Sequence, residues 1–350
     1  MATTTCSAFS GYSAWPASKR FLAFTLTFLL VFGGGGCKRH TSASPAGNAR
    51  PTPSGSVPTE IWKEFSGDKA FAHAKAQCDI GPRPSGSPEL EKVRALIVAE
   101  LQRNGWAVER QIFTDNTPRG PVQFVNLIAR YGGSDKTQQF LVCSHYDTKI
   151  FDTIRFVGAS DGASSTGALM ELSRVLARDP ALAHRVELVF FDGEEAVVQY
   201  SQTNGILTDG LYGSRHYARD LATSGRNRQF RSGVLWDMIG NSKLNITLSP
   251  DSPPQIMQDI FAAADQLQSR NAFSISDRTI LDDHSPLNGE AQIAVIDLIG
   301  FDYPYWHTAD DTLDKLSPQS LATVGAVTLR WLKTAAGQGS APVKKYAGQD

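Results

Sequence analysis

Histidine and carboxylate side chains recur along this chain in five short segments. The segments are SHYDT, ASDGASS, FFDGEEA, LWDMIG and YWHTADD. Histidine nitrogen and carboxylate oxygen bind zinc, and a catalytic zinc ion keeps one coordination position open. A carboxylate that is not needed as a ligand is then available as a general base. The segments therefore predict a zinc enzyme, with the candidate residues His145, Asp147, Asp161, Glu194, Glu195, Asp237 and His307.

Each segment is weak evidence when it is taken alone. A single histidine–aspartate pair such as His145 and Asp147 is usually an accident of the sequence. Two adjacent glutamates are usually solvated, because carboxylates are mostly exposed. Glu194 and Glu195, however, closely follow the apolar run Val186–Phe191, which is not typical of a surface turn. The fixed order of the five segments, each near an apolar run, favours one shared site.

Apolar runs that alternate with amphipathic segments are predicted to position these side chains. This alternation predicts an α/β fold: a single-domain three-layer sandwich in which helices flank a mixed, largely parallel central sheet. Ligands bind beyond the carboxyl ends of the strands in such sheets, where several candidate residues lie. The expected strands are Val125–Ala129, Phe140–Cys143, Val186–Phe191, Val234–Met238 and Ile293–Ile299, and the expected helices are Glu89–Trp106, Ser164–Ala177, Ser214–Ala222, Pro254–Gln268 and Leu321–Leu332.

The composition argues against a nucleic-acid-binding protein. The 350 residues are 41% hydrophobic and 20% charged, with a formal net charge of -1. This balance gives no basic bias toward nucleic acid, so no nucleic-acid partner is expected. The length suits one large domain, which we expect over residues 59–338 and followed by a disordered tail, 339–350.

The first 36 residues are predicted to be a signal peptide. A positive flank, Lys19 and Arg20, precedes the apolar run Phe21–Phe32, which is too short to span a bilayer comfortably. Small residues then precede Cys37, as in a lipoprotein in which this cysteine is lipidated. A plain secretory peptide and an uncleaved anchor are the alternatives. We expect export, with a flexible linker over 37–58 and either a membrane tether or a periplasmic location.

Two cysteines, Cys78 and Cys143, remain in the expected domain. They could pair in an oxidising compartment, but two cysteines do not make a disulfide framework. Cys143 lies inside an apolar run, which favours a buried free thiol.

Further motifs carry a resemblance to a known family. They are GPRPSGS, NLIA, LYGSRH, the acidic block LDDHSP and the tryptophan that precedes His307, and they run in order with the five segments above. The chain resembles the zinc aminopeptidase superfamily and, within it, the glutaminyl cyclases. That resemblance implies a zinc aminopeptidase-like fold, a monomer, and conversion of the N-terminal Gln of peptides or proteins to pyroglutamate with release of ammonia.

The resemblance also implies roles for single residues. Asp161, Glu195 and His307 are similar to the ligands of one zinc ion per chain, and Glu194 is similar to the general base. It further implies that Asp237 and Asp282 are acidic partners of the site and that Trp306 forms a wall of the substrate pocket. His145 and Asp147 are then neighbours of the ligands or ligands of a second metal.

The chain departs from the animal cyclases at several positions. Tyr200 stands where they have tryptophan, Asp302 stands where an aromatic residue is usual, and their disulfide beside the HYD motif is missing. These differences concern substrate contacts more than metal binding.

Two alternatives to the cyclase stay open at this point. The residues His145, Asp161, Glu195, Asp237 and His307 also match the five ligands of a two-zinc aminopeptidase, which would hydrolyse N-terminal residues. A non-catalytic binding module is disfavoured, because it would have no reason to retain a full set of ligands and a base.

Overall fold

The computed structural model of the chain describes residues 58–134, 136–203 and 206–338. The expected signal peptide, Cys37, the linker up to residue 57 and the tail 339–350 lie outside these residues. In the described part of the chain, each helix is too short or too polar to cross a membrane.

The described residues form an eight-stranded sheet, with the strand order β1-β2-β4-β3-β7-β10-β8-β9. Its four central strands, β4, β3, β7 and β10, are parallel to one another, whereas β1 and β2 form an antiparallel hairpin at one edge. A separate short hairpin pairs β5 with β6. The bounds are β1 Trp106–Thr117, β2 Gly120–Tyr131, β3 Phe140–His145, β4 Val186–Phe191, β5 Ser201–Thr203, β6 Ile206–Asp209, β7 Ser232–Asp237, β8 Ile246–Leu248, β9 Phe273–Ile275 and β10 Val295–Ile299.

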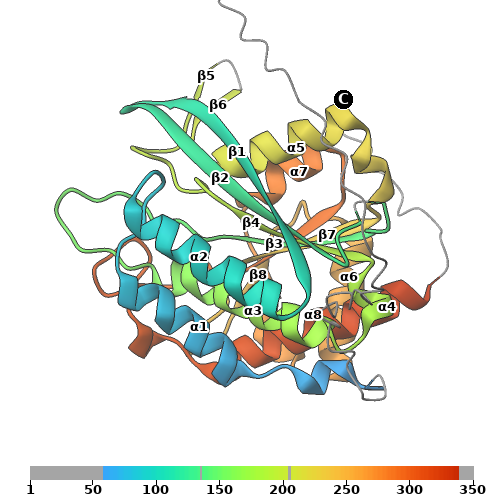
Figure 1. Cartoon of the computed structure of the whole chain (residues 1–350). Coiled ribbons are helices and arrows are strands. Elements are labelled where there is room, and N and C mark those ends of the chain that lie inside the picture. Colours follow the sequence, from blue (N-terminus) through green and yellow to red (C-terminus); the bar gives the residue numbers. More distant parts are fainter. Residues whose placement is uncertain (1–57, 135, 204–205, 339–350) are drawn as a thin grey trace, which may run out of the picture. The chain divides into compact units, whose positions relative to one another are not determined.

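Helices cover both faces of the sheet, as the alternation in the sequence predicted (Figure 1). Helices α1, α2, α3, α6 and α8 contribute to the core on one face, and α5 and α7 to the core on the other. The α-helices are α1 Gly67–Ile80, α2 Pro88–Arg103, α3 Ser165–Leu176, α4 Pro180–Ala183, α5 Tyr212–Ser224, α6 Pro254–Gln266, α7 His284–Gly289 and α8 Pro318–Gly337. Shorter helical turns are η1 Ile61–Glu64, η2 Ala159–Ser164, η3 Arg226–Gln229, η4 Arg270–Ala272 and η5 Leu313–Lys315.

Alternate residues of each central strand enter different cores. On β3, Phe140 and Val142 pack with α1, α2, α3 and α8, whereas Leu141 and Cys143 pack with α5 and α7. Successive side chains of a strand point to opposite faces. A strand that is covered on both faces is therefore a continuous apolar run, which is why the central strands could be predicted from the sequence.

The prediction for helix α2 was correct in its core and wrong at its end. Ser87 caps the helix by accepting a hydrogen bond from the Leu90 backbone N–H (3.1 Å), and Pro88 occupies the first turn. The helix ends before Gly105, whose φ of 86° is left-handed. Trp106 is thus not on the helix: it begins β1, and its indole N–H donates to the Ser173 carbonyl oxygen (3.0 Å).

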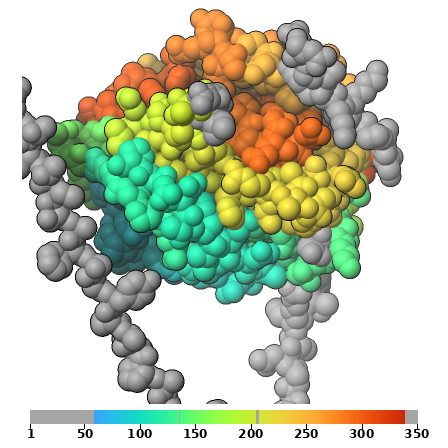
Figure 2. Space-filling view, turned by 90° about the horizontal axis from the view of Figure 1, so that it is seen from above, coloured from blue at the N-terminus to red at the C-terminus, as the bar shows by residue number. Residues whose placement is uncertain are grey.

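One face of the molecule shows how the edge hairpin meets the helices. The hairpin of β1 and β2 lies beside α5, and α7 lies against α5 (Figure 2). In Figure 2 the hairpin is teal, α5 is yellow and α7 is orange. The segment that carries Glu194 and Glu195 follows β4 and leads through β5 and β6 to α5.

The described cysteines do not pair. Cys78 and Cys143 are both free and buried, Cys143 on β3 and Cys78 on α1. The thiol of Cys143 was expected to be free, and burial raises its pKa well above the usual range, so it remains protonated.

Candidate metal centre and catalytic site

Three adjacent parallel strands bring predicted site residues together at their carboxyl ends. His145 is the last residue of β3, Asp237 is the last residue of β7, and Glu194 and Glu195 follow β4. The His145 Nε2 atom lies 3.1 Å from Asp237 Oδ1. Strand β3 lies between β4 and β7 in the sheet. From β3 the chain passes back to β4 on one side and later continues to β7 on the other, so the strand order reverses at β3. Ligand sites in α/β proteins form at such a point.

Asp161 reaches the same place from a distorted helical turn before α3. Within η2, Asp161 has non-helical backbone angles and Gly162 has a φ of 85°. The turn is held by Asp311, whose carboxylate accepts hydrogen bonds from the backbone N–H groups of Ser160 (2.8 Å) and Asp161 (3.1 Å). A side chain at Gly158 would meet the Asp161 carbonyl oxygen at 2.3 Å, so this turn requires a glycine there.

His307 comes from the segment that follows β10 and has a strained backbone. Its φ of 56° is rare for a residue with a side chain, and such strain is typical of functional sites. The His307 Nε2 atom lies 3.0 Å from Glu195 Oε1 and 3.4 Å from Asp161 Oδ2. The structure thus brings Asp161, Glu195 and His307 together, the three residues that the resemblance implied as ligands.

These three side chains fit a metal ion. One potential ligand atom from each lies within 4.8 Å of the others, and Asp161 and Glu195 are buried. Asp161 Oδ2 and Glu195 Oε2 have no hydrogen-bond partner among the described residues. Buried polar atoms are normally paired. Glu195 Oε2 has only the longer ion-pair contact with Lys149 Nζ, at 3.7 Å. Two carboxylates and one imidazole with buried oxygens that lack hydrogen bonds suit a catalytic zinc site.

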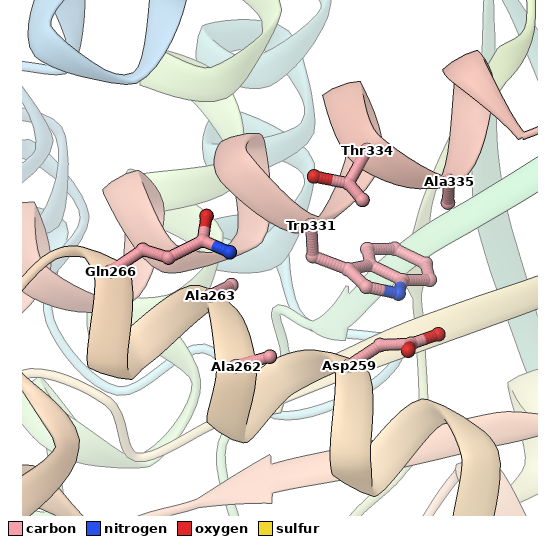
Figure 3. A pocket seen from close by; sticks show the side chains of 7 residues that line it. All are labelled: Asp259, Ala262, Ala263, Gln266, Trp331, Thr334 and Ala335. Carbon is pink, nitrogen blue, oxygen red and sulfur yellow. The ribbon is translucent and has the colours of Figure 1, made fainter.

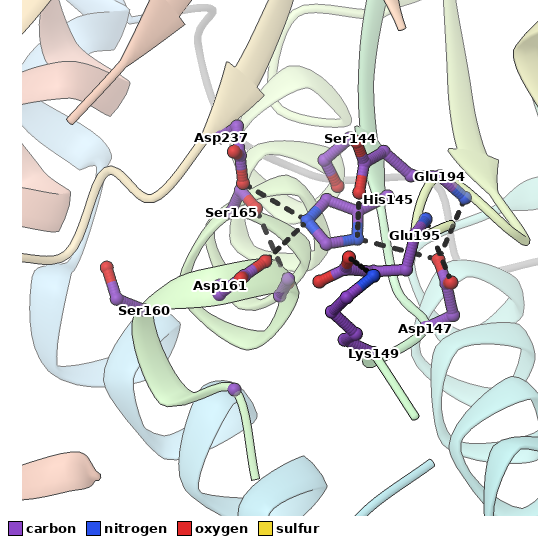
Figure 4. A network of polar contacts seen from close by, with 12 residues as sticks. Ser144, His145, Asp147, Lys149, Ser160, Asp161, Ser165, Glu194, Glu195 and Asp237 are labelled. Carbon is purple, nitrogen blue, oxygen red and sulfur yellow. Dashed lines mark hydrogen bonds and ion pairs between the residues drawn. The ribbon is translucent and has the colours of Figure 1, made fainter. Parts of the chain in front are cut away.

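A second group shares one residue with the first. His145, Asp161 and Asp237 also offer ligand atoms that lie within 4.8 Å of one another. Figure 4 shows Asp237 and Asp161 on the same side of the His145 ring, where both contact its Nε2 atom, while Asp147 lies on the Nδ1 side. Asp161 therefore belongs to both groups, as a bridging ligand of a two-metal site would.

Asp147 lies beside the metal ligands and supports them through the backbone. Its two carboxylate oxygens accept hydrogen bonds from the backbone N–H groups of Glu194 (3.2 Å) and Glu195 (3.3 Å). Asp147 Oδ1 also lies 3.5 Å from His145 Nδ1. One buried carboxylate thus links the segment after β3 to the loop after β4.

The carboxylates around the two histidines favour the charged form of each ring when no metal is bound. Burial lowers the pKa of His307, but Asp161 and Glu195 outweigh it and raise the pKa to about 9. Burial likewise opposes the charge on His145, whereas its hydrogen bonds to Asp147, Asp161 and Asp237 raise its pKa well above the usual range. A histidine binds metal only in its neutral form. Metal binding near neutral pH should therefore release a proton from His307.

Glu194 lies next to the ligands but has different surroundings from Glu195. Burial is the main cause that raises the pKa of Glu194 well above its usual range, and the charges of Glu195, Asp283 and Asp237 add to it while His145 opposes it. Its carboxylate accepts a hydrogen bond from the Tyr200 hydroxyl. Carboxylates with a raised pKa are suited to proton transfer near neutral pH.

Asp282 and Asp237 belong to a buried acidic cluster behind Glu194. Burial and then the charges of Asp297, Asp237 and Glu194 raise the pKa of Asp282 well above its usual range. Asp282 begins the acidic block before α7, and Asp297 lies inside β10. Because close carboxylates cannot all ionise in a buried site, part of this cluster holds protons.

Trp306 forms an exposed apolar surface beside the metal ligands. Its ring stacks on His307, with centroids 4.1 Å apart, and touches Phe301, with centroids 5.1 Å apart. Trp306 is 41% exposed, which is unusual for a large aromatic side chain and leaves it able to contact a substrate.

Sequence reasoning missed two residues that hold the site. Asp311 lies in the YWHTADD segment, but nothing in the spacing distinguished it from a surface aspartate. Arg83, in GPRPSGS, is fully buried, and its guanidinium donates to the backbone oxygens of Tyr146 (2.9 Å), Val157 (2.6 Å) and Gly158 (3.2 Å). The prolines and glycines around Arg83 were the available signal. They mark an irregular segment, in which an arginine is rarely part of an exposed helix surface.

A small pocket elsewhere is not an alternative candidate for the active site. It lies between α6 and α8, beside Trp331 (Figure 3). Its lining includes one ionisable side chain, Asp259, and none of the candidate ligands. The other lining residues are Ala262, Ala263, Gln266, Thr334 and Ala335.

Comparisons with known proteins agree with this geometry. The model of Peptidase family M28 matches residues 126–332. The glutaminyl-peptide cyclotransferase of Boiga dendrophila is 30% identical over 293 residues, covering 72% of this chain and 78% of that protein. The glutaminyl cyclase of an Acidobacteriales bacterium is 31% identical with a TM-score of 0.70, covering 82% of this chain and 98% of that structure.

A differently named solved structure is also similar. The leucine aminopeptidase precursor of Bacteroides thetaiotaomicron is 26% identical, with a TM-score of 0.69, covering 79% of this chain and 98% of that structure. The fold alone therefore does not separate the two chemistries, whereas the sequence relatives favour one of them. The chain belongs to peptidase family M28 and, within it, to the glutaminyl-peptide cyclotransferases.

Proposed function

We propose that this protein converts the N-terminal Gln of peptides and proteins to pyroglutamate, with release of ammonia. The observation that carries the proposal is the placement of Glu194, a buried carboxylate with a raised pKa, directly beside the group of Asp161, Glu195 and His307. Membership of the glutaminyl-peptide cyclotransferases supports the same reaction.

Asp161, Glu195 and His307 would hold one zinc ion per chain. When bound, zinc supplies Lewis-acid polarisation of the side-chain carbonyl of the substrate. The donor set supports this assignment, since it leaves one coordination position for the substrate. Asp311 and Asp147 hold the two segments that present Asp161 and Glu195, so the geometry of the ligands is fixed before the metal binds.

Glu194 would move the proton that the reaction requires. The α-amine of the substrate attacks the δ-carbon of its own Gln side chain, a C–N bond forms, and the bond to the side-chain nitrogen breaks. Glu194 accepts a proton from the attacking amine and returns it to the departing nitrogen, which leaves as ammonia. No water is consumed, and Glu194 ends the reaction in the protonation state in which it began.

The remaining residues would bind and orient the substrate. Trp306 offers an apolar surface for the Gln side chain next to His307, and the buried acids Asp237 and Asp282 are near enough to Glu194 to attract the α-amine. Holding the amine against the carbonyl replaces a search by a flexible chain with a single geometry, which is a large source of rate.

The group of His145, Asp161 and Asp237 supports a second candidate function, an M28-type aminopeptidase. A second metal there would leave Glu194 to activate a metal-bound water and hydrolyse the N-terminal residue. Metal analysis of the purified protein separates the candidates. One tightly bound zinc per chain supports the cyclase, whereas two support the aminopeptidase.

The cyclase proposal is tested with a single peptide that begins with Gln. The zinc-loaded enzyme should release one ammonia per peptide and leave an N-terminus that no longer reacts with amine reagents. Glu194→Gln serves as the control for non-enzymatic cyclisation. A peptide that loses its first residue and keeps a free amine contradicts the proposal.

The sequence also supports a place for the enzyme outside the cytoplasm. We propose processing before Cys37, lipidation of that cysteine and a membrane tether through residues 38–58. One acyl chain binds membranes only marginally, so stable attachment needs more than one.

A further inference from the structure

Tyr200 makes a contact that the roles assigned above do not use. Its hydroxyl donates a hydrogen bond to Glu194 Oε1 and lies 3.1 Å from the Glu194 backbone oxygen. Glu194 is 8% exposed, so few other groups compete for its carboxylate. The single proton of this hydroxyl is therefore directed at Glu194, whose carboxylate and backbone oxygens are both acceptors within reach.

The position of Tyr200 is built by the loop that carries it. Asp209, which is fully buried, accepts hydrogen bonds from the backbone N–H groups of Val197 (2.8 Å), Val198 (2.9 Å) and Gln199 (3.1 Å). One carboxylate thus clamps the three residues that precede Tyr200. An aspartate that satisfies three consecutive backbone donors holds a loop in one conformation.

A glycine makes room for the ring. Gly210 has a φ of 97°, and a Cβ atom there would lie 2.3 Å from the Tyr200 ring. Any other residue at this position would clash with the ring and strain the backbone. The Tyr200 ring therefore packs closely against the chain at residue 210, with its hydroxyl directed at Glu194.

We propose that Tyr200 is a positioning residue for the general base. This inference rests on the proposed function, because it assigns Tyr200 to the proton transfer by Glu194. The phenol holds Glu194 Oε1, while the other oxygen, Oε2, lies 3.9 Å from His145 Nδ1, so the orientation of the carboxylate is fixed from both sides.

Tyr200→Phe tests the proposal, because it removes the hydroxyl and keeps the ring. Its matched control is Tyr217→Phe, since the Tyr217 hydroxyl likewise donates to a buried carboxylate, that of Glu187, but in the core around α5. For Tyr200→Phe, we expect kcat to fall about 10- to 100-fold, KM to change little and bound metal to be retained. Tyr217→Phe should keep the parent kcat at a temperature where it is folded.

A double-mutant cycle shows whether the hydroxyl acts through Glu194. Adding Tyr200→Phe to Glu194→Gln should lower kcat by less than about threefold, because the group that the hydroxyl positions is already disabled. A full further loss in that background would overturn the proposal. So would a Tyr200→Phe variant with the parent kcat, or one with only a raised KM, which would make Tyr200 a wall of the substrate pocket.

The variants still test the role of Tyr200 if the proposed function is wrong. A parent enzyme that releases Leu from a Leu-peptide and no ammonia from a Gln-peptide contradicts the cyclase. The same variants are then compared on the Leu-peptide, where Glu194 is also the base, and the same outcomes support or overturn the role of Tyr200. A parent that is inactive on both peptides contradicts both proposals.

Discussion

Two adjacent glutamates on one loop have different surroundings in this site. Glu195 Oε1 lies 3.0 Å from His307 Nε2, inside the group that could hold a metal, whereas Glu194 is held by the Tyr200 hydroxyl. Asp147 binds the backbone of both and so fixes which way each side chain points. At the scale of single residues, the proposed chemistry depends on this difference, with Glu195 as a metal ligand and Glu194 as the general base.

Replacement of Glu194 by Gln tests that division. The amide has nearly the same shape as the carboxylate but cannot accept the proton, so we expect activity to fall by about 10²- to 10⁴-fold. Bound zinc and the thermal midpoint of unfolding should stay close to those of the parent. A Glu194→Gln variant that loses zinc would indicate that the roles of the two glutamates are exchanged, and one with near-parent turnover would remove Glu194 from catalysis.

Trp306 is tested by replacement with Ala. Loss of an aromatic wall costs roughly 1–2 kcal/mol of substrate binding, so kcat/KM for Gln-peptides should fall about tenfold while zinc is retained. Trp306→Phe is the matched control, since it keeps an aromatic face against His307 and should recover most of the activity. If the alanine variant matches the parent, the substrate pocket lies elsewhere.

At the scale of elements, the central strands and the long helices were predictable because packing controls them. Strand β4 has the bounds that its apolar run predicted, Val186–Phe191. Helix α1 was missed because its buried face consists largely of small residues such as Ala70 and Ala74, which give little apolar contrast. The three-residue strands β8 and β9 are too short to show a period.

The candidate site was predictable to a similar degree. His145 and Asp237 end strands and the two glutamates closely follow one, so their meeting could be expected from the general geometry of parallel sheets. The contacts of Asp311 with the turn of Asp161, and of Tyr200 with Glu194, join segments that are far apart or irregular. The hydrophobic periodicity of the sequence does not predict such contacts, because they depend on loop conformations that form only in the folded chain.

The close packing of α1 on α3 gives a prediction for stability. A Cβ atom on Gly167 would lie 2.6 Å from the Ala70 oxygen and 2.7 Å from the Ala74 nitrogen, both backbone atoms of α1. Gly167→Ala gains helix propensity of about 1 kcal/mol, but the clash costs roughly 1–3 kcal/mol. We expect a net loss in the free energy of unfolding, measured in urea.

Gly289, at the end of α7, is the control for that substitution. A Cβ atom there has no neighbour within 4 Å, so Gly289→Ala should be neutral or slightly stabilising. If Gly167→Ala is as stable as Gly289→Ala, the packing of α1 against α3 is looser than the distances indicate.

At the scale of the whole molecule, the sheet places one reactive region at the carboxyl ends of its central parallel strands. Both faces of the sheet are covered by helices, and the described residues carry the candidate ligands, the base and Trp306 around β3, β4 and β7. The proposed tether is separate from this region in the sequence, so anchoring and catalysis should be independent.

Replacement of Cys37 by Ser tests the tether. The substitution removes the proposed lipidation site, so the protein should move from the membrane fraction to the soluble exported fraction with unchanged specific activity. Cell fractionation followed by an ammonia-release assay measures both. A substituted protein that stays anchored would assign the anchor to the apolar run Phe21–Phe32 and contradict lipidation.

The central claim is that this site cyclises an N-terminal Gln and does not hydrolyse the first peptide bond. The most direct test supplies the zinc-loaded enzyme with equal amounts of two peptides that differ only in their first residue, Gln or Leu, and follows ammonia and free amino acids together. The account predicts ammonia from the Gln-peptide, a blocked N-terminus, and no comparable release of Leu. Faster release of Leu from the Leu-peptide than of ammonia from the Gln-peptide would contradict it.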